Sequence, residues 1–109
     1  MIVGVCYRNV LQKSNFKWYH GKIYAHSDQR TGSGVYALNN YGYIYSHSIS
    51  GDYSRNIQLP FKQGDIVTVE LDPATGKLTY SKQGSPSFVQ DTSIRSTAEP
   101  VHFCAVLGN

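Results

Sequence analysis

Residues 66–81 restrict the fold more than any other part of the chain, because polar and apolar side chains alternate along them. Every second residue is apolar on either side of a short gap: Val67, Val69 and Leu71, then Leu78 and Tyr80. A period of two is typical of a strand with one buried face. The gap, residues 72–76, has proline at its second position and glycine at its last, as a tight turn requires. The stretch therefore predicts an antiparallel hairpin, with Gly76 at positive φ.

The rest of the chain consists of short apolar runs separated by glycine, asparagine, serine and proline. No segment has the three-to-four-residue apolar spacing of a long amphipathic helix. We expect loops over residues 9–28 and 48–56, and Phe88 packing back onto the hairpin. Further strands are expected at these positions: 2–7, 35–38, 43–46 and 101–107, with a short one at 22–25. The sequence therefore predicts one all-β domain over residues 1–109, an antiparallel β-sandwich.

The first and last of these strands allow predictions about burial. Ile2–Tyr7 is apolar on both faces, which is typical of a central strand. Residues 101–107 are also mostly apolar, and we expect them to close the chain as a buried strand, with His102 a core or half-buried histidine and not a ligand. Cys6 and Cys104 are expected to be buried, reduced thiols, with a disulfide as the alternative. Their spacing fits no metal site, so we expect neither a metal nor a cofactor.

The distribution of charge argues against several classes of partner. The ten lysines and arginines are scattered and the net charge is only +3, so no dedicated nucleic-acid surface is expected. No apolar run is long enough to cross a bilayer, and no charged start followed by an apolar stretch resembles a signal peptide. We expect a cytoplasmic or nuclear protein without a membrane partner.

No set of residues forms a catalytic signature. None of the four histidines lies in an acidic or nucleophilic signature, and neither a G-x-S-x-G elbow nor a phosphate-binding glycine loop occurs. Asp65 follows a glycine at a strand entry and Asp72 opens the turn, so we expect both carboxylates to accept backbone N–H groups. The chain is therefore predicted not to be an enzyme.

The segment from Gly64 to Lys82, GDIVTVELDPATGKLTYSK, resembles the SPRY domain family. Four features match the family pattern in order and spacing: Gly64-Asp65, Leu71-Asp72, Gly76 and Leu78-Thr79-Tyr80. Weaker likenesses extend over most of the chain: Ile2-Val3-Gly4-Val5, Gly34-Val35-Tyr36-Ala37 and Glu99-Pro100-Val101. The resemblance implies a sandwich of the SPRY or lectin-like jelly-roll kind.

One departure from the family pattern concerns the start of the chain. A typical SPRY domain opens with a strand of the Tyr-Trp-Glu-Val kind, whereas this sequence begins at Met1 inside the strand that follows. The resemblance thus implies a domain that lacks its opening strand and has an uncovered edge near residues 2–7. Because unpaired edges pair with other chains, we expect a homodimer or strand exchange there.

The resemblance further implies a non-catalytic module that binds a protein or short peptide with loops at one end of the sandwich, as the substrate-recognition part of a ubiquitin ligase or scaffold. Large aromatic and arginine side chains in long loops point to the same function. The candidate binding residues lie in or beside the two expected loops: Arg8, Asn9, Trp18, Tyr19, Tyr53 and Arg55. Trp18 could equally cap the core under its own loop. The alternative function is carbohydrate binding by a lectin-like domain, because tyrosine and tryptophan can stack on sugar rings.

Overall fold

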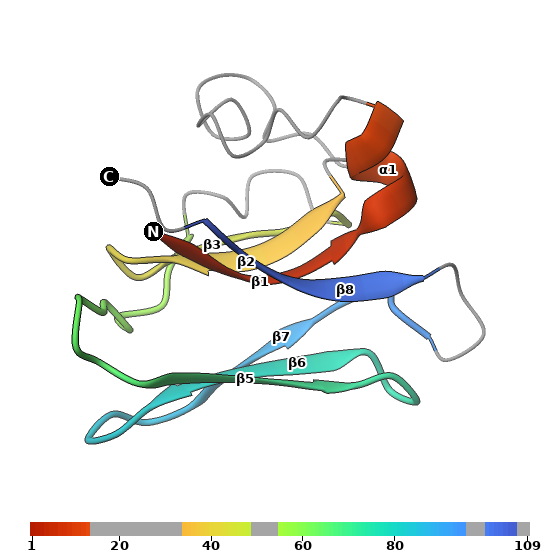
Figure 1. Cartoon of the computed structure of the whole chain (residues 1–109). Helices are drawn as coiled ribbons and strands as arrows, with labels where there is room; N and C mark the ends of the chain where they lie inside the picture. Colours follow the sequence, from red (N-terminus) through yellow and green to blue (C-terminus); the bar gives the residue numbers. More distant parts are fainter. Residues whose placement is uncertain (14–33, 49–54, 96–99, 107–109) are drawn as a thin grey trace.

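In the computed structural model, the described residues (1–13, 34–48, 55–95 and 100–106) form two antiparallel β-sheets packed face to face (Figure 1). The larger sheet has five strands in the order β4-β3-β2-β1-β8. These are β1 (Ile2–Tyr7), β2 (Val35–Asn39), β3 (Tyr43–Tyr45), β4 (Arg55–Asn56) and β8 (Val101–Val106). The smaller sheet has three strands in sequence order: β5 (Val67–Asp72), β6 (Lys77–Lys82) and β7 (Phe88–Asp91). The prediction of an all-β antiparallel sandwich is confirmed.

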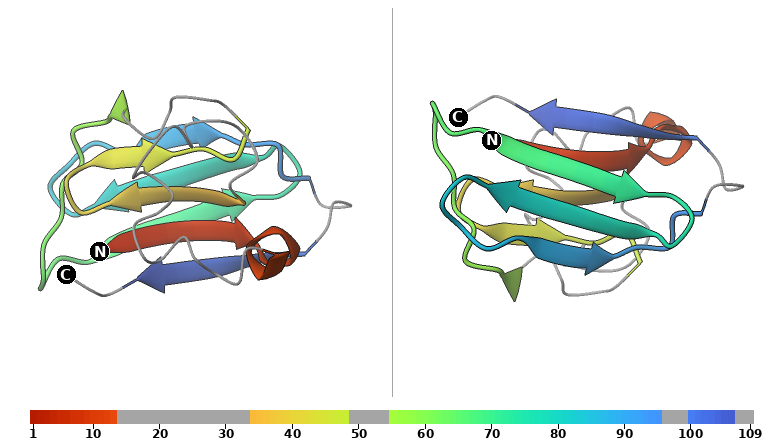
Figure 2. Two further views of the ribbon diagram at one scale, coloured as in Figure 1. Left: turned by 90° about the horizontal axis from the view of Figure 1, so that it is seen from above. Right: turned by 90° about the horizontal axis from the view of Figure 1, so that it is seen from below.

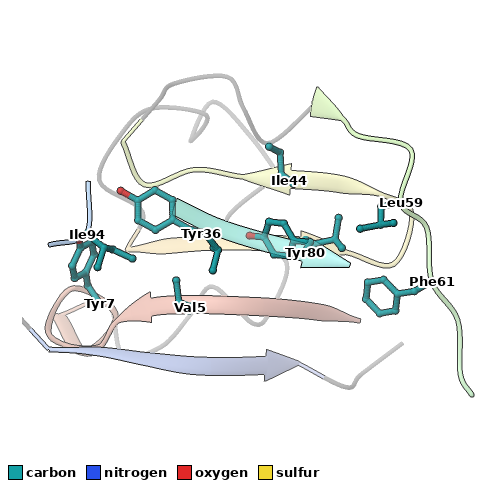
Figure 3. Packing of buried hydrophobic residues seen from close by; sticks show 10 residues of the cluster. Val5, Tyr7, Tyr36, Ile44, Leu59, Phe61, Tyr80 and Ile94 are labelled. Carbon is teal, nitrogen blue, oxygen red and sulfur yellow. The ribbon is translucent and has the colours of Figure 1, made fainter. Parts of the chain in front are cut away.

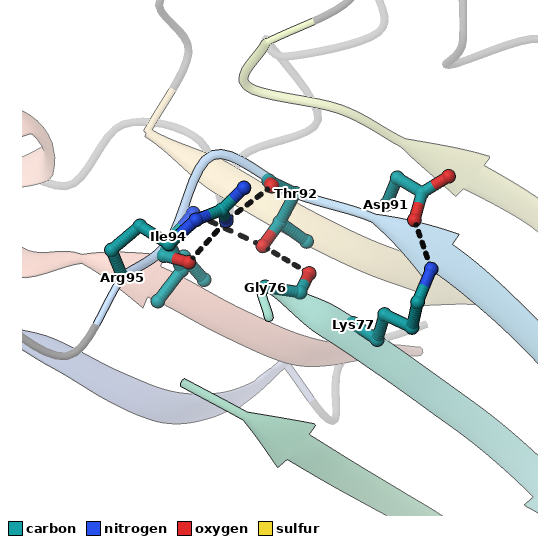
Figure 4. Close-up of polar contacts among 6 residues, drawn as sticks. All are labelled: Gly76, Lys77, Asp91, Thr92, Ile94 and Arg95. Atoms are coloured by element: carbon teal, nitrogen blue, oxygen red, sulfur yellow. Dashed lines mark hydrogen bonds and ion pairs between the residues drawn. The ribbon is translucent and has the colours of Figure 1, made fainter. Parts of the chain in front are cut away.

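The hairpin of β5 and β6 closes as predicted, with Asp72 opposite Lys77. Gly76 lies at φ 78°, in the left-handed region that glycine tolerates best. Packing restricts it further, because a Cβ there would lie 2.7 Å from the Thr92 carbonyl oxygen and would collide with the Arg95 guanidinium (Figure 4). The Gly76 carbonyl accepts hydrogen bonds from the Thr92 N–H at 2.9 Å and from the Thr92 hydroxyl at 2.6 Å. The turn is thereby tied to the chain that follows β7.

Asp65 and Asp72 have the structural roles that were predicted. The Asp65 carboxylate accepts the Lys62 N–H at 2.9 Å and lies 3.7 Å from the Lys82 ammonium. The Asp72 carboxylate accepts the Ala74 N–H at 3.1 Å, inside the turn. Both carboxylates therefore stabilise the hairpin, one at its entry and one at its tip.

The core lies between the sheets, where side chains from both layers meet (Figure 3). Tyr36 from β2 and Tyr80 from β6 are its largest fully buried side chains. The inward residues of β5 share this face but are only half-buried: Val67, Val69 and Leu71. The difference follows from position, because β5 is the outer strand of the smaller sheet and β6 is its middle strand.

β1 is a central strand, as its two apolar faces predict. It pairs with β2 on one side and with β8 on the other. Val5 and Tyr7 face the smaller sheet, while Ile2 and Cys6 belong to a second buried cluster on the outer face. The prediction of an uncovered edge at residues 2–7 is therefore wrong, because both edges of β1 are paired within the chain.

β8 does not have the buried environment predicted for it. His102 is exposed, and Phe103 is 65% exposed. β8 is the last strand of its sheet, and among the described residues no strand pairs with its outer edge. An apolar run predicts a strand, but the burial of that strand depends on how far the opposite sheet extends beneath it.

Residues 8–13 form a short helix, α1 (Arg8–Lys13), where a loop was expected. This segment contains no glycine or proline, and Val10 is half-buried against the core. Local propensity and packing therefore both favour a helical turn. The strand expected at residues 22–25 lies outside the described residues, as do most of the two expected loops.

Candidate functional site

The structure describes three of the six residues predicted to bind a partner. Arg8 and Asn9 are exposed at the start of α1, and Arg55 is exposed in β4. The other three lie outside the described residues: Trp18, Tyr19 and Tyr53.

The described candidates do not lie together. Arg55 pairs with Ile44, Ile44 with Leu38, and Leu38 with Val3 of β1. From Arg55 to Val3 the path crosses three strand spacings, and from Val3 to Arg8 it runs five residues along mostly extended chain. These two perpendicular displacements put the backbones of Arg8 and Arg55 roughly 20 Å apart. Figure 2 shows α1 and β4 at opposite corners of the larger sheet. Arg8 and Arg55 therefore belong to separate surfaces.

Arg55 lies instead at the same edge of the larger sheet as two exposed tyrosines, the edge formed by β3 and β4. Tyr43 is 37% exposed and pairs directly with Asn56, the residue after Arg55. Tyr41, which is 74% exposed, lies in the turn before β3. We call the edge that carries Tyr41, Tyr43, Arg55 and Asn56 the tyrosine–arginine edge. Arg55 pairs with the buried Ile44 and so points toward the smaller sheet, whereas Tyr43 and Asn56 point to the outer face of the larger sheet. Sequence reasoning missed both tyrosines, although the Asn-Asn-Tyr-Gly sequence is typical of an exposed hairpin tip.

The turn that carries these tyrosines is fixed by Asn39. The side-chain oxygen of Asn39 accepts the backbone N–H groups of Tyr41 and Tyr43, both at 3.0 Å. Gly42 has φ 92°, and its carbonyl accepts the N–H of Ile57, just after β4, at 2.9 Å. The turn and β4 thus keep one arrangement, and a preorganised surface loses less entropy when it binds.

Arg55 also covers the core on this side of the sandwich, which we call the closed side. Its Cζ lies 5.1 Å from the centre of the Phe88 ring in β7, a cation–π geometry. Gln90, also in β7, donates to the Tyr45 carbonyl of β3 at 2.8 Å and accepts the Tyr80 hydroxyl at 2.7 Å. Burial raises the pKa of the Tyr80 hydroxyl, which keeps it protonated as the donor. The closed side is therefore linked across the two sheets by polar groups.

The opposite side, formed by β5 and β8, has no such cover in the part of the chain that the structure describes. Phe103 faces inward, because it pairs with Val5, which is completely buried. It is nevertheless 65% exposed, and Figure 2 shows β8 projecting beyond β5. We call this surface the open side; its apolar members are Phe103 from β8 and, from β5, Val67, Val69 and Leu71. No pattern in the sequence marked it.

A polar cluster lies where β1 ends. The Ser93 hydroxyl oxygen lies 2.6 Å from that of Tyr36 and 3.3 Å from that of Tyr7. The His47 ring centre lies 4.9 Å from the Tyr7 ring centre, and His47 Nδ1 accepts the Gly34 N–H at 2.7 Å. Because Nδ1 is already an acceptor, it is not available to take a proton from a nucleophile. The arrangement is that of a structural hydrogen-bond network.

Cys6 and Cys104 are neighbours in the fold, although nearly the whole chain separates them. Cys104 packs against the outer cluster that contains Cys6. A hydrogen bond between the two thiols lowers the pKa of Cys6 and raises that of Cys104, and burial adds to the rise at Cys104. Both are free thiols. The predicted burial is confirmed for Cys6, whereas Cys104 is only half-buried because it lies on an edge strand.

Residues 1–13, 34–48, 55–95 and 100–106 contain no group of three histidine, cysteine, aspartate or glutamate side chains placed to bind a metal ion. They also include no helix with the length and apolar character needed to cross a bilayer. Comparison of the chain with protein-family models, curated proteins and solved structures gave no match.

Proposed function

We propose that the chain is a non-catalytic module that binds a protein or a short peptide, with the tyrosine–arginine edge as its recognition surface. The observation that carries the proposal is that two exposed tyrosines and an exposed arginine lie along one short edge, with Tyr43 on its outer face and Arg55 on its inner face. Tyrosine and arginine are enriched among the residues that dominate binding energy, because each buries a large area and keeps a polar end. The fixed turn at Asn39 supports the proposal, since the tyrosines need not be ordered on binding.

The SPRY-like order of motifs supports the same function. A module of that family recognises its partner on a rigid sandwich and performs no chemistry itself. In this proposal the chain is a SPRY-like domain that recognises substrates for a ubiquitin ligase, or partners for a scaffold, in the cytoplasm or nucleus. Of the remaining candidate residues, Arg8 and Asn9 lie in α1 and belong to a separate surface. The other three stay candidates for either surface: Trp18, Tyr19 and Tyr53.

The test is a selection of peptides from a random display library on the wild-type protein, followed by calorimetric titration of the selected peptides. Tyr43→Ala combined with Arg55→Ala should lower the affinity of these peptides by at least about tenfold, since each such anchor typically contributes more than about 1 kcal/mol to the binding free energy. The matched control is Arg8→Ala, which removes an exposed arginine roughly 20 Å away and should leave the affinity unchanged. The reverse pattern would move the site to α1.

Arg55→Lys separates recognition from folding. Lysine keeps a cation near Phe88, so the unfolding midpoint should barely change, while the planar guanidinium that binds carboxylates and carbonyls is lost. Full affinity in the double variant would contradict the proposed surface. Binding to a glycan array, with no peptide selected, would favour the carbohydrate-binding alternative.

A further inference from the structure

On the open side, the smaller sheet ends at the edge strand β5. Among the described strands, β5 pairs only with β6, so its outer edge presents backbone N–H and C=O groups without a strand partner there. Its inward side chains are half-buried, whereas Leu78 and Tyr80 opposite them on β6 are completely buried. An edge of this kind, with apolar side chains along one face, is a template for a further strand.

β8, in the opposite sheet, covers the region beside the outer edge of β5. Phe103 and Ala105 lie opposite Val5 and Val3, so both project toward the layer of the smaller sheet, and both are exposed. Packed sheets lie about 10 Å apart, and a strand added beside β5 would lie about 4.8 Å from it. The inward side chains of such a strand would therefore meet the Phe103 ring.

We propose that the open side binds a single extended peptide strand, which pairs with the outer edge of β5 and buries its apolar side chains under Phe103 of β8. Addition of a strand to a sheet edge gains affinity from main-chain hydrogen bonds and specificity from alternate side chains. This site is separate from the tyrosine–arginine edge and does not depend on it.

The exposed face of β5 defines the charge of the peptide. Glu70 and Asp72 both point to this face and are exposed. Asp72 lies opposite Lys77 of β6, whereas Glu70 lies opposite the neutral Thr79. A lysine or arginine on the outward face of the peptide, beside Glu70, is the complement that this edge requires. The occupant is therefore a strand with apolar residues at every second position and basic residues between them.

The overhang of β8 favours a lone strand over a second folded copy. Two copies joined through their β5 strands would form one continuous smaller sheet in one layer. In the other layer each β8, which projects beyond β5, would enter the space of the other copy's β8 (Figure 2). A peptide strand brings no second sheet and meets no such obstacle.

The probe for this site is a seven-residue peptide, blocked at both ends, with valine at every second position and lysine between. We expect calorimetric binding to the wild-type protein and slower amide hydrogen exchange in β5. Phe103→Ser should weaken the binding by at least about tenfold, because it removes the aromatic cover. A peptide of the same composition with its valines in one block is the control for nonspecific adhesion and should not bind.

A charge exchange at Glu70 distinguishes loss of the binding contact from loss of folding. Glu70→Lys should prevent binding of the lysine probe, while a probe with glutamate in place of lysine should bind this variant and not the wild type. The double variant Tyr43→Ala, Arg55→Ala should bind the lysine probe with unchanged affinity. Failure of this proposal and failure of the proposed function are thereby distinguishable.

Three results would overturn the proposal. The first is no binding of the lysine probe at millimolar concentration. The second is an affinity that neither Phe103→Ser nor Glu70→Lys changes. The third is a dimer in light scattering that Phe103→Ser converts to a monomer, which would assign the open side to a second copy of the chain.

Discussion

The two long sides of the sandwich end in different ways. On the closed side Arg55 covers the Phe88 ring, and Gln90 links β7 to β3. On the open side Phe103 faces inward and is still 65% exposed. Inward orientation and burial are thus separate properties. Orientation follows from the register of a strand, whereas burial follows from how far the opposite sheet extends.

A very short segment is enough to cover the core at one side of the sandwich. β4 has only two residues, yet one of them, Arg55, lies over the Phe88 ring. The aliphatic stem of an arginine can cover apolar surface while its charge stays in water. The inward positions of the open side have no long charged side chain: Val67, Val69, Leu71, Val101, Phe103 and Ala105. These side chains are half-buried or exposed, so the open side stays partly open to water in the part of the chain that the structure describes.

Gly76→Val should have the largest effect, because both sides depend on the position of the smaller sheet. The valine Cβ would lie 2.7 Å from the Thr92 carbonyl oxygen, at a φ of 78°. We expect a loss of roughly 3 kcal/mol or more in the free energy of unfolding, measured by chemical denaturation. The matched control is Gly84→Val, at φ 85° with open space around it, which should lose only about 1 kcal/mol. Equal losses would show that backbone strain alone acts at Gly76.

Gln90→Ala tests the polar link of the closed side. It would remove the acceptor of the Tyr80 hydroxyl and one donor to the Tyr45 carbonyl in the core. We expect a loss of about 2 kcal/mol, because an unsatisfied buried polar group retains its desolvation penalty. Tyr80→Phe in the same background should recover part of that loss, which a double-mutant cycle measures. No recovery would mean that the link between Gln90 and Tyr80 contributes nothing.

Arg55→Ala should destabilise the closed side by a smaller amount. Removal of the cation from the Phe88 ring is expected to lower the free energy of unfolding by about 0.5–1 kcal/mol, with less change for Arg55→Lys. Denaturation of both variants beside Arg8→Ala separates this contact from a general effect of net charge. The same loss in Arg8→Ala would contradict a specific role for Arg55.

Phe103→Ser should change stability least. This holds although phenylalanine is larger than the glutamine and the arginine that the two closed-side variants remove. Phe103 is already mostly in water, so we expect a change within about 0.5 kcal/mol in thermal or chemical unfolding. A loss above about 1.5 kcal/mol, the range of a buried aromatic, would mean that the open side is closed in solution.

The parts of the fold that could be predicted are those with local signals. Alternation and turn chemistry defined the hairpin around Gly76, and two apolar faces identified β1 as central. The contact of Arg55 with Phe88 and the exposure of Phe103 depend on segments far apart in the chain, so no local pattern contains them. α1 is too short to show a helical period. For the binding surface, the sequence indicated Arg55, but the register that sets Asn56 beside Tyr43 came only from the structure.

The pairing of β1 with β8 has a consequence for the order of folding. The hairpin of β5 and β6 needs only the four residues between them, whereas β1 and β8 are the first and last strands that the structure describes. Contacts between distant segments form late, because closing a long loop loses more chain entropy than closing a short one. During synthesis, β1 therefore keeps a free edge until residue 101 and those after it emerge. Among the side chains that the structure describes, Phe103 is one of the last to reach its place, and partial opening of the native state releases β8 before any central strand.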